Sequence, residues 1–355
     1  MFNQDQVKVT VIIPVYNTYK YITRCLNSIT AQILSDIEII CVDDGSTDGS
    51  LELLHKIAER DRRISILEIS NSGPGKARNL ALTKATGKYI AYIDSDDHIH
   101  KRMLFDMYSA AEKNKVDIVA CSIRKFSEDN QKFGRCSYNK ILSIKFKNKA
   151  FTWEDLKEKI FELRFVCMNK LYRKDFLIES KSFFLENVFF EDMPFFYNSM
   201  LKAKKIFYID KAYYNNLRLR KGATTFEQSN REIGIITAFK KVSKLLESDY
   251  KFEILKPHFE AFMISRLIEK LHRNDKDNIA EYYYEIKKHV MECDFSKNHY
   301  ISQTLKKKIE IIENEDLIGY LTYELNSVNK KLAYMKRVIK SPKNIVKYFF
   351  KRGYI

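Results

Sequence analysis

With 355 residues, 45% of them hydrophobic and 30% charged, the chain has the make-up of a soluble globular protein with room for roughly two or three domains. No apolar run approaches the roughly 18–20 residues that cross a bilayer, and a secretory leader is not expected. The cysteines are scattered without a C-x-x-C pair, so we expect reduced thiols of a cytoplasmic protein instead of a zinc site or a disulfide framework.

The net charge of +16 is unevenly distributed along the chain. Residues 1–100 carry a net charge of −2 and residues 101–225 one of +11, while residues 325–355 hold nine basic residues and no acidic one. A nucleic-acid-binding protein would interleave basic and exposed aromatic residues over its first domain. Because residues 1–100 are net acidic, this alternative is disfavoured and no nucleic-acid partner is expected. This uneven distribution of charge favours a catalytic first region, a basic acceptor-facing middle region and a membrane-facing tail. The plainer interpretation is that the excess positive charge only keeps the protein soluble.

The first hundred residues alternate buried strands with helices. Residues 7–15 are nearly all β-branched, as in a strand covered on both faces, and Pro14 is expected to end its ladder because it has no N–H. A helix follows whose apolar residues run from Ile22 to Ile33 at helical spacing. Further strands, with helices between them, are expected over 37–42, 64–69, 89–93 and 116–122. The pattern predicts an α/β fold whose mostly parallel sheet, flanked by helices, binds ligands at the carboxyl ends of its strands.

Three carboxylates within four positions follow the central strand, at Asp94, Asp96 and Asp97. Like charges in contact repel and are costly to desolvate, so a positive partner is expected among them. A divalent cation held by one or two carboxylates and by the phosphates of a substrate fits best. In an extended backbone residues i and i+2 face the same way, so Asp94 and Asp96 would address one ion while Asp97 points elsewhere.

The segments after the second and third strands offer further contacts. Asp43 and Asp44 form either a turn that caps the next helix or a carboxylate pair that accepts hydrogen bonds from a base or a ribose. Residues 73–79 offer a helix N-terminus, with Lys76 and Arg78 as diphosphate or base contacts. The G-x-G-x-x-G fingerprint of dinucleotide-binding domains is missing after the first strand.

Taken together, four segments closely resemble the motifs of family 2 glycosyltransferases of the GT-A fold, the type that builds bacterial cell-surface polysaccharides. In chain order they are Val11–Asn17, Val42–Asp48, Gly75–Asn79 and Asp94–Asp97. The resemblance implies a nucleotide-sugar donor, most often a UDP-sugar, and Mn²⁺ or Mg²⁺ as cofactor.

The resemblance also implies donor contacts in the first two motifs. By position, Pro14 and Tyr16 would lie against the uracil, and Asp43 or Asp44 would bind the base or the ribose. Arg78 would help to hold the nucleotide.

At the central strand the resemblance places Asp94 and Ser95 on the ribose or the sugar, and Asp96 together with Asp94 on the metal ion. Residues 184–196 resemble the second-half signature of the family, in which an acid pair opens a helix under the sugar site. By that match Asp192 would be the general base, with Glu191 as its neighbour and as an acceptor contact.

Asp192 also has a purely structural interpretation, because an aspartate two residues before Pro194 is a good N-cap with proline in the first helical turn. The surrounding aromatic side chains could raise the pKa of a carboxyl toward the value that a base needs, but they equally suit core packing. These side chains are Phe189, Phe190, Phe195 and Phe196.

Residues 213–225 resemble the basic loop that closes over the donor diphosphate in this family. Arg218 and Arg220 would neutralise the leaving group, whereas Ala223 stands where the family often has serine, which leaves a hydroxyl contact in doubt. A solvated basic loop is the plainer alternative.

We expect a catalytic domain over residues 1–225, with a nucleotide-binding half (1–122) and an acceptor half (123–225). A helical domain over 226–324 would serve packing or homodimer formation. The basic amphipathic tail over 325–355 fits peripheral attachment to the inner face of a membrane, or packing on the protein or a partner.

The sequence thus predicts an inverting hexosyl- or N-acetylhexosaminyltransferase of the cytoplasm. Its acceptor would be a hydroxyl of a glycan or of a lipid-linked molecule in surface polysaccharide assembly; inversion is implied by the family alone. The enzymatic alternative is a sugar nucleotidyltransferase, which needs a glycine-rich, arginine-bearing loop directly after the first strand. Residues 14–17 contain no glycine, so this alternative is disfavoured.

Overall fold

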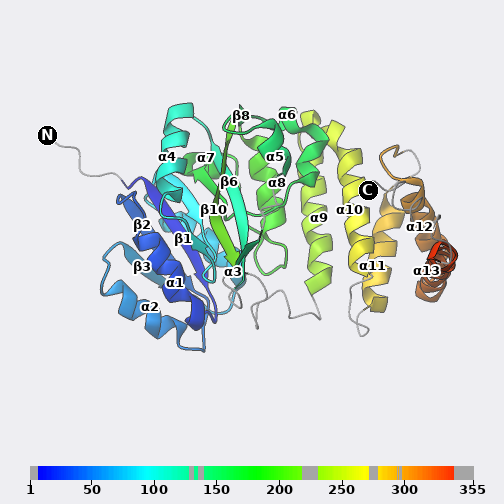
Figure 1. Cartoon of the computed structure of the whole chain (residues 1–355), viewed down its shortest axis with the longest axis horizontal. Helices are drawn as coiled ribbons and strands as arrows, with labels where there is room; N and C mark the ends of the chain where they lie inside the picture. Colours follow the sequence, from blue (N-terminus) through cyan, green and yellow to red (C-terminus); the bar gives the residue numbers. More distant parts are fainter. Residues whose placement is uncertain are drawn as a thin grey trace. The chain divides into compact units, whose positions relative to one another are not determined.

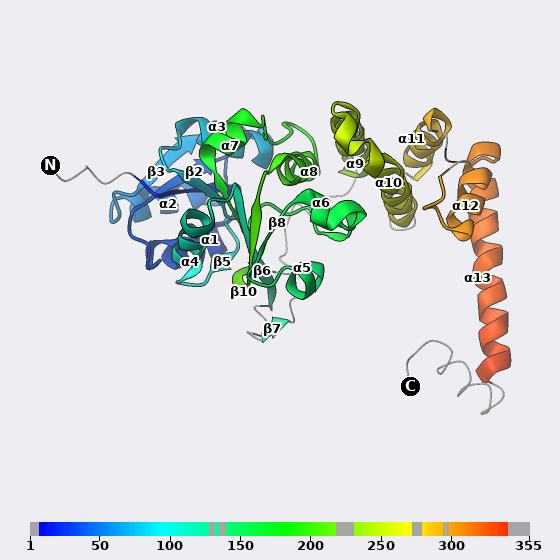
Figure 2. The same cartoon turned by 90° about the horizontal axis from the view of Figure 1, so that it is seen from above.

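The computed structural model describes residues 7–127, 132–134, 140–217, 231–271, 279–293, 295 and 298–339 (Figures 1 and 2). Its internal contacts divide the chain into two compact units, residues 1–259 and 260–355. The first unit contains the sheet, and the second is helical. Helix α9 (Arg231–Glu247) falls within the first unit. The predicted three-part division at 225 and 324 stays a prediction.

One sheet forms the centre of the first unit, and the described residues contribute ten strands to it, with the main order β3-β2-β1-β4-β9-β6-β10-β5. In chain order the strands are β1 (Val9–Val15), β2 (Ile37–Asp43), β3 (Ile64–Glu68), β4 (Tyr89–Tyr92), β5 (His98–Ile99), β6 (Ile118–Ser127), β7 (Lys132–Gly134), β8 (Ala150–Phe151), β9 (Lys170–Arg173) and β10 (Ile206–Leu217). Strands β1 to β4 pair in parallel, as do β6 and β10, whereas β9 lies antiparallel between β4 and β6. The predicted α/β fold with a mostly parallel sheet is confirmed.

Helices flank this sheet, as Figure 1 shows. In chain order the first unit holds α1 (Tyr19–Thr30), α2 (Ser50–Ala58), α3 (Gly73–Lys84), α4 (Met103–Asn114), α5 (Lys140–Lys145), α6 (Trp153–Leu156), η1 (Lys157–Glu162), α7 (Lys174–Glu179), α8 (Asp192–Lys202), α9 and η3 (Tyr250–Leu255). Six of the seven residues of β1 are buried, because helices cover both faces of the sheet and a strand in that place needs apolar side chains all along.

Two local expectations differ from the structure. Pro14 does not end its strand, since β1 continues to Val15 and pairs there with Asp43 of β2. The proline is tolerated because β1 pairs with its other neighbour, β4, only as far as Ile12. Helix α1 ends at Thr30, so that Ile33 lies beyond it and is exposed.

The second unit consists of helices that pack through aromatic side chains. It comprises the greater part of α10 (Lys256–Leu271), then α11 (Ile279–Glu292), α12 (Gln303–Asn314) and α13 (Leu317–Ile339). Tyr283 of α11 packs against Tyr320 of α13 with ring centroids 5.7 Å apart. Among the described residues we find no helix with the length and apolar character that crossing a membrane requires.

Candidate active site

The candidate site lies at the carboxyl ends of β1, β2 and β4. These three strands are parallel neighbours, so their ends meet at one edge of the sheet. Tyr16 follows β1 and is exposed, Asp43 ends β2, and Asp94 follows β4. Pro14, within β1, is half-buried. Arg218 and Arg220 lie outside the described residues.

Asp43 and Asp44 are both buried but use their oxygens differently. The two carboxylate oxygens of Asp44 accept hydrogen bonds from the backbone N–H groups of Ser72 (2.6 Å) and Gly73 (2.7 Å). Asp44 therefore fixes the loop that leads into α3. Asp43 accepts two backbone hydrogen bonds with Oδ2 alone, and its buried Oδ1 has no partner among the described residues. Of the two, Asp43 retains an oxygen for a ligand.

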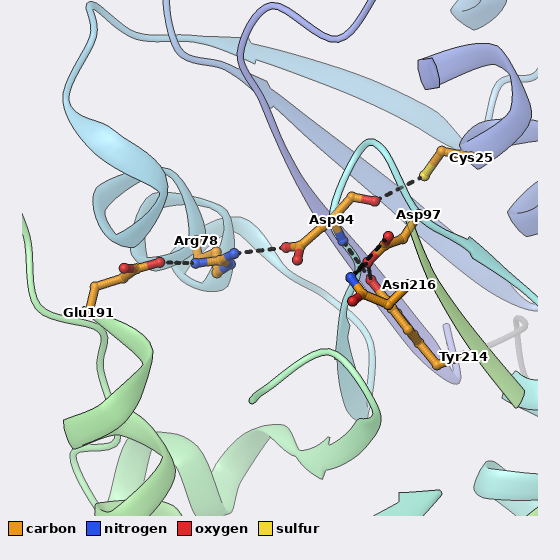
Figure 3. Close-up of polar contacts among 7 residues, drawn as sticks. All are labelled: Cys25, Arg78, Asp94, Asp97, Glu191, Tyr214 and Asn216. Carbon is orange, nitrogen blue, oxygen red and sulfur yellow. Dashed lines mark hydrogen bonds and ion pairs between the residues drawn. The ribbon is translucent and has the colours of Figure 1, made fainter. Parts of the chain in front are cut away.

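The guanidinium of Arg78 joins two of the predicted acidic motifs (Figure 3). Its Nη2 donates to Asp94 Oδ1 at 2.9 Å, and its Nη1 donates to Glu191 Oε1 at 2.8 Å. The side chain is 6% exposed and lies 5.1 Å from the ring of Phe184. Arg78 thus connects the turn after β4 with the residue that precedes α8, which its spacing in the sequence did not indicate.

The segment that carries Glu191 is held against α3 by two further contacts. The Asn79 side chain donates to the carbonyl of Phe184 (3.0 Å) and accepts from its N–H (2.9 Å). A Cβ on Gly75 would lie 2.0 Å from the carbonyl oxygen of Leu185, so only glycine permits this approach. Helix α3 and the segment before α8 therefore form one support for Arg78 and Glu191.

The acidic residues after β4 form a turn. Strand β4 ends at Tyr92, and the N–H of Asp97 donates to the carbonyl of Asp94 at 3.0 Å. The expectation of an extended backbone over Asp94–Asp96 is therefore wrong. In a turn of this kind, residues i and i+2 do not face the same way as they do in a strand. Arg24 Nη2 donates to the carbonyl of Asp96 at 2.9 Å and holds the turn from α1. Ser95, within the turn, is buried.

Asp97 faces β10 and binds it through both oxygens (Figure 3). It accepts hydrogen bonds from the hydroxyl of Tyr214 (2.7 Å) and the N–H of Leu217 (2.6 Å), and the amide of Asn216 also contacts it. The same hydroxyl accepts the N–H of Asp94 at 3.2 Å. Burial, followed by the charges of Asp96 and Asp94, raises the pKa of the Asp97 carboxyl well above its ordinary value. Tyr214 was not predicted, and no pattern in the sequence indicates its role.

Asp192 is the first residue of α8, while Glu191 occupies the N-cap position and makes no capping hydrogen bond with its side chain. The structure therefore differs from the interpretation of Asp192 as the N-cap. Burial and the adjacent charge of Glu191 raise the pKa of Asp192 well above its ordinary value, against the opposing effect of Arg78. A carboxyl with a raised pKa is suited to accept a proton near neutral pH.

A divalent cation suits the donor set at the turn after β4. The described residues contain no group of three or more His, Cys, Asp or Glu side chains able to hold a metal ion alone. Mg²⁺ and Mn²⁺ prefer hard oxygen ligands, and Mg²⁺ in particular is held by one or two carboxylates together with substrate phosphates. Asp94 and Asp96 supply such oxygens, although Arg78 already binds Oδ1 of Asp94. The residues therefore fit a cation shared with a diphosphate.

The sheet order and the acidic turn at its edge define the class of GT-A glycosyltransferases. The same fold occurs in the crystal structure of residues 1–349 of Staphylococcus aureus TarS in complex with UDP-GlcNAc, with a TM-score of 0.75 at 23% identity over 91% of this chain and 92% of that one. The mannosyltransferase PcManGT of Pyrobaculum calidifontis, in complex with GDP-Man and Mn²⁺, has a TM-score of 0.50 at 16% identity over 90% and 87% of the two chains.

Sequence comparison gives the family. Residues 10–179 match the description of glycosyl transferase family 2. EpsJ of Bacillus subtilis, an uncharacterized glycosyltransferase, is 34% identical over 211 residues, 58% of this chain and 60% of EpsJ. TarS of Staphylococcus aureus, a poly(ribitol-phosphate) beta-N-acetylglucosaminyltransferase, is 32% identical over 213 residues, 59% of this chain and 35% of TarS. The match thus covers less than two thirds of either relative. Residues 10–179 thus form a glycosyltransferase family 2 domain, as the four motifs predicted.

Proposed function

We propose that this protein transfers a sugar from a nucleotide-sugar donor to a hydroxyl group of a glycan or lipid-linked acceptor in surface polysaccharide assembly. The observation that carries the proposal is the pair of hydrogen bonds from Arg78 to Asp94 and Glu191. They bring the donor-side turn next to Asp192, a carboxyl whose raised pKa suits a base. The relatives support a hexosyl or N-acetylhexosaminyl group, and the UDP-GlcNAc complex of TarS supports a UDP-sugar.

On the donor side, each residue has a role that follows from its place at the edge of the sheet. Tyr16 and Pro14 pack against the base, and the unpartnered Oδ1 of Asp43 accepts a hydrogen bond from a base N–H or a ribose hydroxyl. Asp94 and Ser95 contact the ribose or the sugar.

Asp96, with the second oxygen of Asp94, holds Mn²⁺ or Mg²⁺. The PcManGT complex contains Mn²⁺, which supports the use of a divalent cation. When bound, the cation offsets the negative charge that builds up on the diphosphate as the glycosidic bond breaks. Arg218 and Arg220, outside the described residues, are proposed to neutralise the same charge.

On the acceptor side, Asp192 removes the proton from a hydroxyl held in line with the anomeric carbon. Glu191 raises the pKa of this base by its charge and is itself positioned by Arg78. It also offers an oxygen to the acceptor. A single displacement by the deprotonated hydroxyl inverts the anomeric configuration.

The experiment is a panel of UDP-sugars assayed with Mn²⁺ for transfer and for hydrolysis. Asp192→Asn should lower transfer by about 100-fold or more, because the general base is lost, while donor binding measured by calorimetry remains. Asp96→Ala should abolish metal-dependent transfer. Asp175→Asn, the same chemical change at an exposed carboxylate of α7, is the control. Full turnover by Asp192→Asn, or the absence of metal-assisted donor binding in the unmodified protein, would refute the proposal.

Peripheral attachment through residues 325–355 is a separate proposal that rests on charge. Nine basic residues without an acid would contribute about 1 kcal/mol each at an anionic surface. Flotation with anionic vesicles, with and without residues 325–355, measures it; equal binding by the two forms would contradict it.

A further inference from the structure

Strand β9 begins with a buried lysine that the proposed function does not use. Lys170 pairs with Ala120 of β6, and the next residue, Leu171, pairs with Ala91 of β4. The strand therefore lies in the interior of the sheet, where apolar residues are expected. The side chain of Lys170 belongs to a residue that is only 3% exposed. Burying an ammonium group costs free energy that an apolar side chain of similar length would not cost.

The hydrogen bonds of this ammonium group fix its place without neutralising its charge. Nζ of Lys170 donates to the carbonyl of Val166 (2.5 Å) and to Asn169 Oδ1 (2.9 Å). Asn169 is held in turn by β6, because its amide donates to the carbonyl of Cys121. Both acceptors of Lys170 are uncharged, so the positive charge is positioned precisely but is not cancelled by them.

The same ammonium group lies against the first turn of α8. Its Nζ is 4.8 Å from the centroid of the Phe196 ring. Phe196 follows Asp192 by four residues, so the two side chains share one face of the helix, and helical side chains lean toward the N-terminus. A cation near a helix N-terminus opposes the helix dipole, so this placement does not stabilise α8 itself. It brings a positive charge to the side of α8 that carries Asp192.

Lys170 and Asp192 affect each other through their charges. Burial lowers the pKa of Lys170 to about 8, whereas the negative charge of Asp192 acts to raise it. Lys170 is therefore mostly a cation at neutral pH. By the same interaction the cation favours the ionised form of Asp192. It opposes burial and the charge of Glu191, which together hold the pKa of Asp192 well above its ordinary value.

The other charged groups that face Asp192 are bound to one another. Arg78 acts on Asp192 in the same direction as a cation on β9 would, but its guanidinium donates to Asp94 and to Glu191. The charges of Asp94 and Glu191 both raise the pKa of Asp192. A second cation on the opposite side of this group therefore has a clear electrostatic use.

The titratable groups around Lys170 itself are thiols and a phenol. Burial raises the pKa of Cys167 to about 12 and that of Tyr172 well above its ordinary value, so both are uncharged near neutral pH. Cys121 of β6 is a further buried thiol beside Lys170. Among these described groups, Asp192 is the carboxylate on which the charge of Lys170 acts.

We propose that Lys170 is a positioning residue for the base, and that its positive charge keeps the carboxylate of Asp192 ionised in the free enzyme at neutral pH. A base has to be deprotonated before each turnover, so a carboxyl that is too hard to ionise would be inactive at that pH. Lys170 acts through Asp192 and does not touch the sugar. This inference rests on the proposed function, in which Asp192 accepts the proton of the acceptor hydroxyl.

Two substitutions separate the charge of Lys170 from its hydrogen bonds. Lys170→Gln retains a donor for the carbonyl of Val166 without the charge, and Lys170→Met removes both. In each variant the acidic limb of the pH profile of kcat/KM should move up by about one pH unit, so that kcat/KM on this limb falls about tenfold. Lys174→Gln is the matched control, since Lys174 Nζ also donates to a backbone carbonyl, that of Ala85 (3.2 Å). Its profile should not move.

Carbon-13 NMR of the aspartate carboxyl groups follows the same change without any turnover. The signal that is lost in Asp192→Asn identifies Asp192, and its pKa should rise by about one unit in Lys170→Gln and in Lys170→Met. Circular dichroism reports whether the variants are folded.

An unchanged carboxyl pKa of Asp192 in both variants would overturn the inference. So would an unmodified profile in Lys170→Gln beside a shifted one in Lys170→Met, because the lysine would then act through its hydrogen bond to Val166 alone. A protein that transfers no sugar would contradict the proposed function, and the NMR titration would still decide whether the charge of Lys170 acts on Asp192.

Discussion

Arg78 donates a hydrogen bond to Glu191 across 2.8 Å, although 113 residues separate the two in the sequence. The pair links α3 to the residue before α8, the helix that begins with the proposed base. Arg78 also binds Asp94, so one buried cation sets the distance between the donor side and the acceptor side.

Replacing Arg78 should therefore affect stability and activity together. Arg78→Met leaves two partly buried carboxylates close together without their cation, which should lower the free energy of unfolding by about 3 kcal/mol. The free energy of unfolding of Arg78→Lys should lie between those of Arg78→Met and the unmodified protein. Lysine keeps the charge, but its ammonium cannot reproduce the forked geometry of the guanidinium. Urea unfolding measures the difference. Arg102→Met removes an exposed ion pair with Asp106 and should change stability little. Equal stability of Arg78→Met and the unmodified protein would contradict this account.

Glu191→Gln should shift the acidic limb of the pH profile of kcat/KM. Deprotonated Asp192 is the active form of a base, so its raised pKa places this limb well above the ordinary aspartate range near 3.9. The charge of Glu191 contributes to that rise, and its removal should move the limb to lower pH. Because the folded state favours protonated Asp192, stability should fall as the pH rises through the same range. If the acidic limb of Glu191→Gln stays at the same pH or moves to higher pH, a group other than Asp192 titrates there.

The close approach of α3 to the segment before α8 can be tested with two glycines of one helix. Gly75→Ala forces a methyl group into the carbonyl of Leu185 and should cost about 3 kcal/mol, with reduced transfer because Glu191 moves. Gly73→Ala meets no atom within 4 Å but has a φ of +84°, so it should cost only about 1 kcal/mol. Thermal unfolding and transfer rates are compared. The prediction fails if the two substitutions have the same effect.

Tyr214→Phe should loosen the turn that carries Asp94 and Asp96. The change removes the hydrogen bond to Asp97 and deprives the N–H of Asp94 of its acceptor, at a cost of about 1–3 kcal/mol. The Mn²⁺ concentration for half-maximal activity should rise.

Tyr213→Phe is the control, since its hydroxyl also binds a carboxylate, that of Asp106, away from the turn. It should lower stability without changing the metal dependence. A normal metal dependence in Tyr214→Phe would leave that residue with a structural role alone.

Much of the fold follows from local patterns. The β-branched run from Val9 to Val15 and the alternation of strands with helices predicted the parallel sheet, because burial on both faces demands apolar residues in sequence. The four motifs predicted the family because each is a contiguous stretch of the chain. They lie at the end of β1, at and beyond the end of β2, in the first turns of α3 and in the turn after β4. The helix ends and the shape of the turn at Asp94 were predicted less well, because neighbouring elements decide them.

Contacts between distant segments depended on the folded chain. Arg78 with Glu191, and Asp97 with Tyr214, join residues more than a hundred positions apart, and neither partner carries a periodic or compositional mark of the other. A single sequence encodes which residue types can be buried and where the chain turns. Only the packing of α3, α8 and β10 around one edge of the sheet brings these carboxylates, the guanidinium and the phenol within hydrogen-bond distance, because that distance depends on the order in which strands cross the sheet.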